Sequence, residues 1–351
     1  MEDVNNKSSK PFHRSTIDDV ARGAGVSKTT ISRYLSGQFD SLSEQTRKRI
    51  EETIAALKYR PNRMARGLKR DKSFTIGMIV ADITNPFSTS ILRGVEDVCT
   101  KNGYSLMVCN TDNDPEKEKE YIMMLQAHRI DGLIINSTGQ NNEYLHELAE
   151  EKIPIVLVDR KAPELNFDTV VTDNVQATTK AIEFFLEQGY DRIAFFTQPI
   201  GMVSSRSERA GTFQKMLEAA NHPSTSDIYE ADIRAEGQLE QKIDEFLASS
   251  EGQFRMLFAA NGVMMLKILN IFQLKQIRIP DDIGVACYDD LDWAPVIGPG
   301  ITTIAQPTYS IGVNAMERVL ARIIGDQSPG VLIALPGTLN VRGSTPSKAG
   351  T

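Results

Sequence analysis

Short, almost wholly apolar runs alternate with amphipathic stretches from residue 73 to residue 343. Strands that are buried on both faces have this composition, and they occur in parallel sheets whose crossovers are helices. Stretches of helical length, such as 86–102 and 177–188, lie between the runs. The apolar runs include 76–80, 105–109, 133–135, 155–158, 170–172, 193–196, 256–259 and 283–287. This pattern predicts a doubly wound α/β body, and its size predicts two such lobes.

Polar residues stand directly after many of these apolar runs. In open α/β sheets, ligands bind beyond the carboxyl ends of the strands. Acids and amides recur there, and they suit a polyhydroxylated ligand because they accept or bridge hydroxyl groups. At any single position a helix N-cap is an equal alternative, so the inference rests on recurrence at six strand ends. The segments are 82–87, 110–112, 159–160, 173–174, 261 and 288–290.

Residues 15–37 predict two short helices that meet at a glycine corner. Ile17, Val20 and Ala24 recur at helical spacing, and Thr16 is a suitable N-cap. Gly25 ends the first helix, because a tight corner there needs a residue that tolerates positive φ. Ser27 then caps a second helix. This is helix-turn-helix geometry, in which early residues of the second helix reach base edges in the major groove. A helical hairpin with a merely solvated polar face is the alternative.

A third amphipathic helix is predicted within residues 43–59, and a short basic helix follows at 61–69. Pro61 suits a first helical position. The second of these helices is shorter than the ~12–15 residues that an isolated helix needs in water, and Gly67 weakens it further. It is therefore interpreted as a hinge that folds when paired with its copy on DNA, with Leu68 as a minor-groove wedge and Arg63 and Arg66 on phosphates. A basic flexible linker is the alternative.

The charge of the chain is unevenly distributed. The net charge is −7, but residues 1–72 hold 16 Lys and Arg against 9 Asp and Glu, which leaves 23 basic and 37 acidic residues in the rest. A basic head on an acidic body indicates a nucleic-acid module joined to something else.

The remaining composition predicts a soluble, cytoplasmic protein, associated with the bacterial nucleoid when bound to DNA, with no cofactor and no metal. The cysteines, at 99, 109 and 287, lie in apolar surroundings and suit buried thiols. The four histidines show no ligand spacing. Residues 1–14 lack the apolar core of a signal peptide, and no stretch approaches the ~20 apolar residues that cross a bilayer.

The runs VARGAGVSKTTISRYLSG and YRPNRMARGL resemble the lac-repressor (LacI/GalR) family of bacterial regulators, and the resemblance covers about residues 15–343. It implies a helix-turn-helix headpiece, a periplasmic-binding-protein-like sensor and a homodimer on a pseudo-palindromic operator. It also implies that Lys28, Thr29 and Arg33 read bases and that Thr30 and Ser32 grip the DNA backbone. The full predicted DNA-binding set is Ser27, Lys28, Thr29, Thr30, Ser32, Arg33, Asn62, Arg63, Ala65, Arg66 and Leu68.

In the body, the segments DITNPF, VLVDR, VTDN, SERAGTF and IPDDIGVACYDD continue the resemblance. By that pattern Asp159, Arg209, Asn261 and Asp289 contact a small-molecule effector, with Asn85 and Phe87 at its other side. Two residues depart from the family pattern. Thr212 stands where Gly is usual, and Gly262 stands where Asp is usual, which puts the local shape of the pocket in doubt.

Arg160 and Arg206 join the predicted effector site, together with Asp112 at another strand end. Guanidinium groups bind carboxylates bidentately, so a sugar acid is favoured over a neutral sugar. The alternative is that these arginines pair with nearby acids at the surface.

We therefore expect a repressor of a carbohydrate catabolic operon, released from DNA by a sugar or by a sugar acid such as a uronate, an aldonate or a keto-deoxy sugar acid. Alternatives are a regulator of the same family that takes a nucleobase or other metabolite as co-repressor, and a secreted sugar-binding protein, which would have no use for the head. No catalytic motif of the GxxxxGK[ST], GxGxxG, GxSxG or HExxH type is present, which argues against an enzyme.

The expected domains follow from these patterns. They are a disordered tail at 1–14, the helix-turn-helix at 15–60, the hinge and linker at 61–72, and the sensor at 73–343 with a tail at 344–351. Within the sensor, the N-lobe is expected at 73–172 plus 306–328 and the C-lobe at 173–305 plus 329–343.

Overall fold

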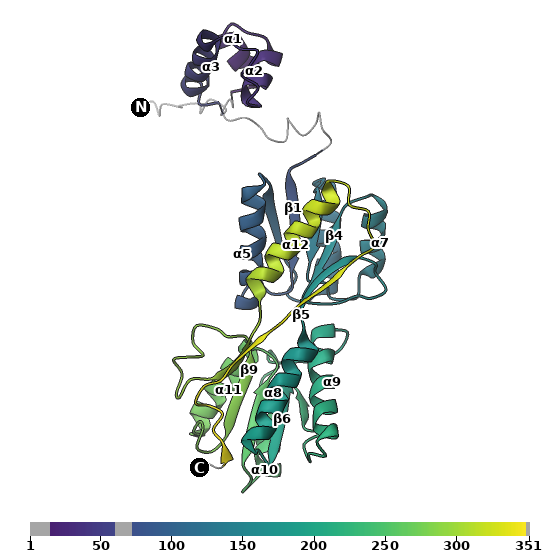
Figure 1. Ribbon diagram of the computed structural model, residues 1–351, viewed down its shortest axis with the longest axis vertical. Helices are drawn as coiled ribbons and strands as arrows, with labels where there is room; N and C mark the ends of the chain where they lie inside the picture. The colour runs from purple at the N-terminus through teal and green to yellow at the C-terminus, as the bar shows by residue number, and fades with distance from the viewer. Residues whose placement is uncertain (1–14, 60–71, 349–351) are drawn as a thin grey trace, which may run out of the picture. The chain divides into compact units, whose positions relative to one another are not determined.

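The computed structural model describes residues 15–59 and 72–348. The chain divides into two units, one up to Ser73 and one from Phe74 onward, and each is described by itself (Figure 1). The predicted tail at 1–14 and the predicted hinge at 61–69 lie outside the described residues. Within them, no helix is long and apolar enough to span a bilayer.

The first unit holds three helices: α1 (Ile17–Gly23), α2 (Lys28–Leu35) and α3 (Glu44–Ala56). Local sequence sets their starts. Thr16 and Asp19 form a capping box at α1, and the Ser27 side chain accepts the Thr30 N–H at the start of α2. Gly25 has φ +60° at the corner between them. Val20, Ile31 and Ile50 are fully buried and join the three helices in one small core, which confirms the predicted helix-turn-helix.

The N-lobe contains a six-stranded sheet in the order β11-β5-β4-β3-β1-β2, and all its strand pairs are parallel. Helices cover both faces: one apolar core includes residues of α5 and α12, and the other includes residues of α6 and α7. The strands are β1 (Thr75–Val80), β2 (Ser105–Asn110), β3 (Gly132–Ile135), β4 (Ile155–Val158), β5 (Asp168–Thr172) and β11 (Leu332–Leu335). The helices are α5 (Pro86–Lys101), α6 (Pro115–Ala127), α7 (Asn142–Glu150) and α12 (Thr308–Ile323).

The C-lobe repeats the same topology, with the order β12-β10-β9-β8-β6-β7, and only its edge strand β12 is antiparallel. Its cores include residues of α8 and α9 on one face and of α10 and α11 on the other. The strands are β6 (Arg192–Thr197), β7 (Ile228–Glu230), β8 (Arg255–Ala259), β9 (Gly284–Tyr288), β10 (Thr302–Ala305) and β12 (Thr338–Asn340). The helices are α8 (Asn174–Gln188), α9 (Ser204–Ala219), α10 (Gln238–Ser249) and α11 (Gly262–Lys275). The two predicted doubly wound lobes are thereby confirmed.

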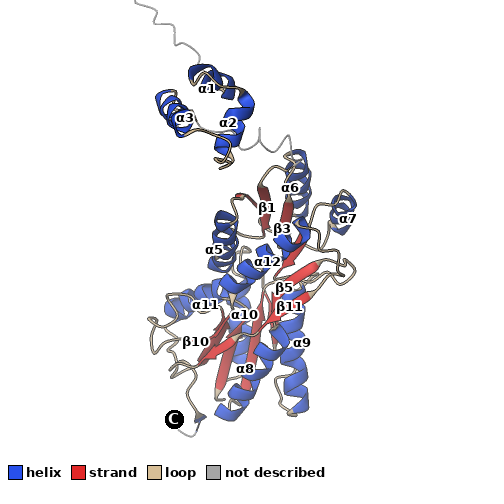
Figure 2. Cartoon of the chain, turned by 45° about the horizontal axis from the view of Figure 1, so that its top comes forward, coloured by secondary structure: helices blue, strands red, loops and turns tan. Residues whose placement is uncertain are grey.

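Two of the expected lobe boundaries differ from the structure. Residues 329–343 were assigned to the C-lobe, but β11 pairs with β5 in the N-lobe sheet (Figure 2), so the last crossing lies between β11 and β12. A four-residue apolar strand fits the edge of either sheet, and the sequence alone does not choose. Residues 344–351 were assigned to a tail, yet Ser344 and Thr345 are buried, and the Ser344 hydroxyl donates to the Val285 carbonyl at 2.7 Å.

Helix α12 follows the C-lobe strand β10 in the chain but packs in the N-lobe beside α5 (Figure 1). Glycines allow this close approach. A Cβ on Gly94 would lie 2.2 Å from the Tyr309 carbonyl oxygen, and one on Gly312 would lie 2.1 Å from that of Ile91. The backbones of the two helices are therefore in direct contact.

An ionic cluster fixes the far end of α12. The Asp168 side chain is fully buried and accepts hydrogen bonds from Arg322 at 2.8 and 2.9 Å and from Arg318 at 3.1 Å. The Val331 N–H also donates to it, at 3.0 Å. One carboxylate thus ties together β5, α12 and the segment that leads into β11.

Candidate functional sites

The second helix of the head presents a polar face. Ser27, Lys28, Thr29 and Arg33 are exposed, while Thr30 and Ser32 are partly covered. Lys28 pairs with Asp18 at 2.6 Å, and Arg33 forms no ion pair within residues 15–59 and 72–348. The face therefore offers hydroxyls and a guanidinium to an outside partner. The other predicted DNA contacts, Asn62, Arg63, Ala65, Arg66 and Leu68, lie outside the described residues.

A cleft between the two lobes encloses about 710 Å³, including its open mouth. It lies at the carboxyl ends of both sheets, where the sequence predicted a ligand. Eight of the predicted effector residues line it: Asn85, Phe87, Asp159, Arg160, Arg206, Arg209, Asn261 and Asp289. The lobes also touch beside the cleft, because the Lys161 N–H donates to the Ser204 hydroxyl at 2.7 Å and the Lys161 ammonium pairs with Glu208.

Two acids occupy equivalent places in the two lobes. Asp159 follows β4 and Asp289 follows β9, the third strand of each sheet order, and both have positive φ, +65° and +74°. Asp tolerates this conformation better than most residues, and strained residues of this kind cluster at functional sites. Burial raises the pKa of Asp159, Arg160 and Arg209 act against that rise, and Asp289 adds to it. Asp289 accepts from the Gly262 N–H at 3.0 Å and from Gln306 at 2.6 Å.

Arg209 is buried at the base of the cleft, and its guanidinium binds in three directions. It donates to the Asn174 side chain at 2.8 Å, to the Ala260 carbonyl at 2.7 Å and to the Gln306 side chain at 3.0 Å. It also lies over the Tyr288 ring, 3.7 Å from the centroid. Arg209 therefore joins α8, the residue that follows β8 and the crossing into α12 at one point.

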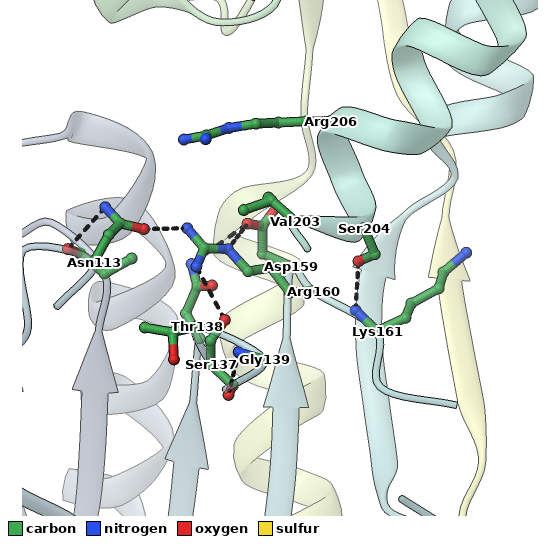
Figure 3. A network of polar contacts seen from close by, with 12 residues as sticks. Asn113, Ser137, Thr138, Gly139, Asp159, Arg160, Lys161, Val203, Ser204 and Arg206 are labelled. Carbon is green, nitrogen blue, oxygen red and sulfur yellow. Dashed lines mark hydrogen bonds and ion pairs between the residues drawn. The ribbon is translucent and has the colours of Figure 1, made fainter. Parts of the chain in front are cut away.

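Arg160 is also buried, at the N-lobe side of the cleft (Figure 3). Its guanidinium donates to the Ser137 carbonyl at 3.0 Å and to the Asn113 side chain. The Asp159 carboxylate lies 3.9 Å from its Nε. The alternative of a surface ion pair does not describe Arg160, because its side chain is buried and its acidic neighbour Asp159 also lines the cleft.

The remaining polar residues of the cleft divide into predicted and overlooked ones. Asn85 and Asn261 line it and also cap α5 and α11, so the N-cap interpretation and the ligand interpretation apply to the same side chains. Asp112 does not line it: its carboxylate pairs with Lys117 at 2.8 Å. Asn136 and Gln306 line the cleft and were overlooked, although each directly follows a strand, as the strand-end rule requires.

The two departures from the family pattern are accommodated without closing the cleft. Thr212 is buried on α9 next to the core residue Phe213. At Gly262 a Cβ would lie 2.7 Å from the Leu291 side chain. The Gly262 N–H donates to Asp289 at 3.0 Å, so this position contacts an acid that lines the cleft.

A three-helix head with an exposed polar second helix, on a chain with a two-lobed α/β cleft, defines a helix-turn-helix transcriptional regulator of the type that carries a binding-protein-like unit. The family model described as "Bacterial regulatory proteins, lacI family" matches residues 16–62, and that of a periplasmic binding protein-like domain matches residues 182–345. The chain is 47% identical over 335 residues to the HTH-type transcriptional regulator KdgR of Bacillus subtilis, covering 95% of this chain and 99% of that protein.

Other relatives agree. The chain is 43% identical over 333 residues to the HTH-type transcriptional regulator PtxS of Pseudomonas putida, covering 95% and 96% of the two proteins. Among solved structures, a lac repressor dimer bound to operator and an anti-inducer aligns with a TM-score of 0.83 at 26% identity, covering 95% of this chain and 100% of that one. The chain belongs to the lacI family of bacterial regulatory proteins and is a DNA-binding transcriptional regulator, which confirms the resemblance seen in the sequence.

Proposed function

We propose that this protein is a homodimeric repressor that leaves its operator when a polyhydroxylated small molecule, a sugar or a sugar acid, fills the cleft. The observation that carries the proposal is the lining of that cleft. Carboxylates, amides and guanidinium groups come from both lobes, among them Asp159, Asn136, Asn261 and Arg209. Hydroxyl-rich ligands need many directed donors and acceptors.

One orphaned atom supports a hydroxyl-bearing ligand. Asn136 is buried, its amide nitrogen donates to Asp159 at 3.4 Å, and its Oδ1 is buried without a hydrogen-bond partner among the residues that the structure describes. A buried acceptor without a partner costs about 1–3 kcal/mol, so it favours a ligand that donates to it. A sugar hydroxyl supplies that hydrogen.

The contacts to DNA are proposed for the exposed face of α2, with the hinge residues assigned by the family resemblance. Lys28, Thr29 and Arg33 read base edges, Ser27, Thr30 and Ser32 hold phosphates, and two such helices from a dimer address the two halves of a pseudo-palindromic operator. The lac repressor dimer on its operator, similar over nearly the whole chain, supports this arrangement. No enzymatic step is part of the proposal.

The test measures operator affinity of the full chain by fluorescence anisotropy, with and without each member of a panel of hexoses, pentoses, uronates and aldonates. Thermal shift of the same samples reports binding by itself, since a ligand of the folded state raises the melting temperature. We expect at least one compound to raise the melting temperature and weaken operator binding. A compound that tightens operator binding would instead establish co-repression, and a panel without any response would refute the ligand class.

Replacing Arg33 by alanine tests the proposed base contacts. We expect binding to the operator to weaken by about 10- to 100-fold, because a bidentate base contact contributes ~1–3 kcal/mol of discrimination. Binding to random duplex of the same length should fall by less than about threefold. Lys215→Ala, which removes an exposed cation from α9, is the control and should change neither. Equal losses on operator and random DNA would show that Arg33 meets only phosphates.

A further inference from the structure

An aromatic ring and a cation lie together where the head passes from α2 to α3. Phe39 is in the loop between the two helices, and Arg47 lies near the start of α3. The guanidinium carbon of Arg47 lies over the Phe39 ring, 4.1 Å from its centroid. At this distance the cation is attracted by the electron-rich face of the ring. The contact therefore holds the Arg47 side chain in one place on the surface of the head.

The loop that carries Phe39 is itself held against the last turn of α2. The Gln38 N–H donates to the Arg33 carbonyl at 3.0 Å. Tyr34, from the same turn of α2, meets the Phe39 ring edge to face with 5.7 Å between the ring centroids. Phe39 is thus fixed from α2, and Arg47 is fixed through Phe39 beside the carboxyl end of that helix.

Phe39 contributes little to the apolar core of the head. Its side chain is 37% exposed, and it is not among the residues that form the small core around Ile31 and Ile50. The ring therefore acts mainly through its contacts with Tyr34 and Arg47.

The hydrogen-bonding capacity of Arg47 is unused within the head. Its side chain is exposed, and no side chain or carbonyl among the described residues accepts a hydrogen bond from it. Ion pairs in this part of the chain join Arg22 to Asp19 and Lys28 to Asp18, and none of those described involves Arg47. A guanidinium group carries several N–H donors in one plane, and their geometry matches the oxygens of a phosphate. Arg47 can therefore bind an anion from outside the chain.

The position of Arg47 suits the DNA backbone. In helix-turn-helix proteins the second helix lies in the major groove, which is bordered by phosphates on both sides. Contacts to phosphates fix the register of the protein on the duplex and carry no sequence information. Among the described residues, the phosphate contacts proposed above all come from α2 and its N-cap. Arg47 offers one from a different helix, at the end of α2 opposite to Ser27.

We propose that Arg47, positioned by the Phe39 ring, binds a phosphate of the DNA backbone at the border of the major groove. The inference goes beyond the proposed function, because it concerns DNA binding alone and does not depend on the effector. A phosphate contact displaces condensed counterions from DNA, so its loss is measured as a weaker dependence of affinity on salt.

The experiment measures the affinity of the full-length protein for a labelled duplex of random sequence and for the operator over a series of KCl concentrations. Arg47→Gln should make the plot of log affinity against log salt shallower by about 0.9 for each head on the duplex. Near physiological salt it should weaken binding to both duplexes by about three- to tenfold, because a phosphate contact is independent of sequence. The random duplex makes the test independent of the identity of the operator.

The matched control is Arg49→Gln. Arg49 is an exposed cation on the same helix, and it lines a groove between α1 and α3. Its replacement removes the same charge and should leave the salt dependence as in wild type. An unchanged salt dependence in Arg47→Gln would overturn the proposal. A loss on the operator with full affinity for the random duplex would also overturn it, because Arg47 would then be a base contact.

Arg47→Lys separates the charge from the fold of the head. It keeps a cation at the site, so the salt dependence should stay close to that of wild type. If Arg47→Lys lost as much salt dependence as Arg47→Gln, the effect would come from a disturbed head, and the phosphate contact would be refuted. A circular-dichroism melt of each variant shows whether it is folded.

The positioning role of Phe39 is tested by a double-mutant cycle. Phe39→Leu should weaken binding to both duplexes about two- to fivefold in the wild-type background, as expected for loss of an exposed cation–π contact. It should cause no further loss in Arg47→Gln, because the ring acts through the cation. Phe39→Tyr keeps the face of the ring and should bind like wild type. Equal losses in both backgrounds would show that Phe39 does not position Arg47.

Discussion

Replacing Asp168 by alanine should lower the free energy of unfolding of the two-lobed unit by about 3–5 kcal/mol, among the largest effects expected of a single side chain in this protein. The substitution leaves Arg318 and Arg322 partly buried beside an empty space and removes the acceptor of the Val331 N–H. It also removes the hydrogen bonds that hold α12 and the segment before β11 against β5. Urea denaturation of the full chain, followed by circular dichroism, measures the change.

The pH dependence of that difference provides a second check. Burial alone would raise the pKa of Asp168, but hydrogen bonds from Arg322, the Val331 N–H and Arg318 outweigh it, and the pKa lies below its usual value. A group whose pKa is lowered by folding stabilises the protein above its unfolded pKa, about 4, and loses that contribution as the pH falls through its folded pKa. The stability difference between wild type and Asp168→Ala should therefore be full at pH 6–7 and shrink below about pH 4.

The control for Asp168 is Glu317→Ala, which removes an exposed carboxylate from the same helix. It should change the unfolding free energy by less than about 0.5 kcal/mol. If Asp168→Ala were as mild as this control, the cluster would be an ion pair whose desolvation offsets its attraction. Asp168→Asn is expected to lie between the two, since it keeps an acceptor but not the charge.

The second large effect concerns the effector. Arg209→Met should raise the ligand concentration for half-release of operator at least ~30-fold, since loss of a buried charged partner costs about 2–5 kcal/mol. Its guanidinium meets Asn174, Ala260 and Gln306 in three directions, and a methionine meets none of them. Operator binding without ligand should stay within about threefold of wild type, so the variant behaves as a repressor that no longer responds.

Two companion variants make the result for Arg209 interpretable. Arg209→Lys should fail nearly as badly, because a single ammonium cannot reproduce a planar guanidinium that binds three partners and stacks on Tyr288. Lys215→Met on the exposed side of the same helix should respond like wild type. A normal ligand response in Arg209→Met would exclude Arg209 from the effector site.

Much of the fold could be read from the sequence, because the signals were local. Thr16 and Ser27 cap their helices as predicted, since a cap depends on three or four consecutive residues. The apolar runs located the central strands, since burial on both faces leaves no polar position in them. The prediction for strand β11 names the wrong lobe, because the sheet edge on which a short apolar strand pairs depends on the course of the preceding chain.

The residues of the cleft could be predicted only where they directly follow a strand whose end lies at the cleft. Asp159 and Asp289 follow central strands, and both line it. Asp112 follows β2, which is the outermost strand of its sheet. The same rule therefore places its side chain at the edge of the sheet, where it pairs with Lys117 instead of lining the cleft. The strand-end rule therefore identifies cleft residues only when the order of the strands in the sheet is known, and the sequence alone does not show that order. The role of Asn113 as the holder of Arg160 depends on a contact between residues 47 positions apart and had no local signal.

The course of the chain through the lobes has a consequence for synthesis on the ribosome. The head is built from one continuous stretch that ends near residue 59, so it can fold as soon as that stretch emerges, as N-terminal domains generally do. The N-lobe, by contrast, lacks α12 and β11 until residue 335 has been made, after the strands β6 to β10 of the C-lobe. During that interval the nascent protein has a complete helix-turn-helix head and an incomplete two-lobed unit. The face of α5 that packs against α12 is still uncovered. Chains whose synthesis stops before residue 335 would keep a folded head and lack a complete two-lobed unit.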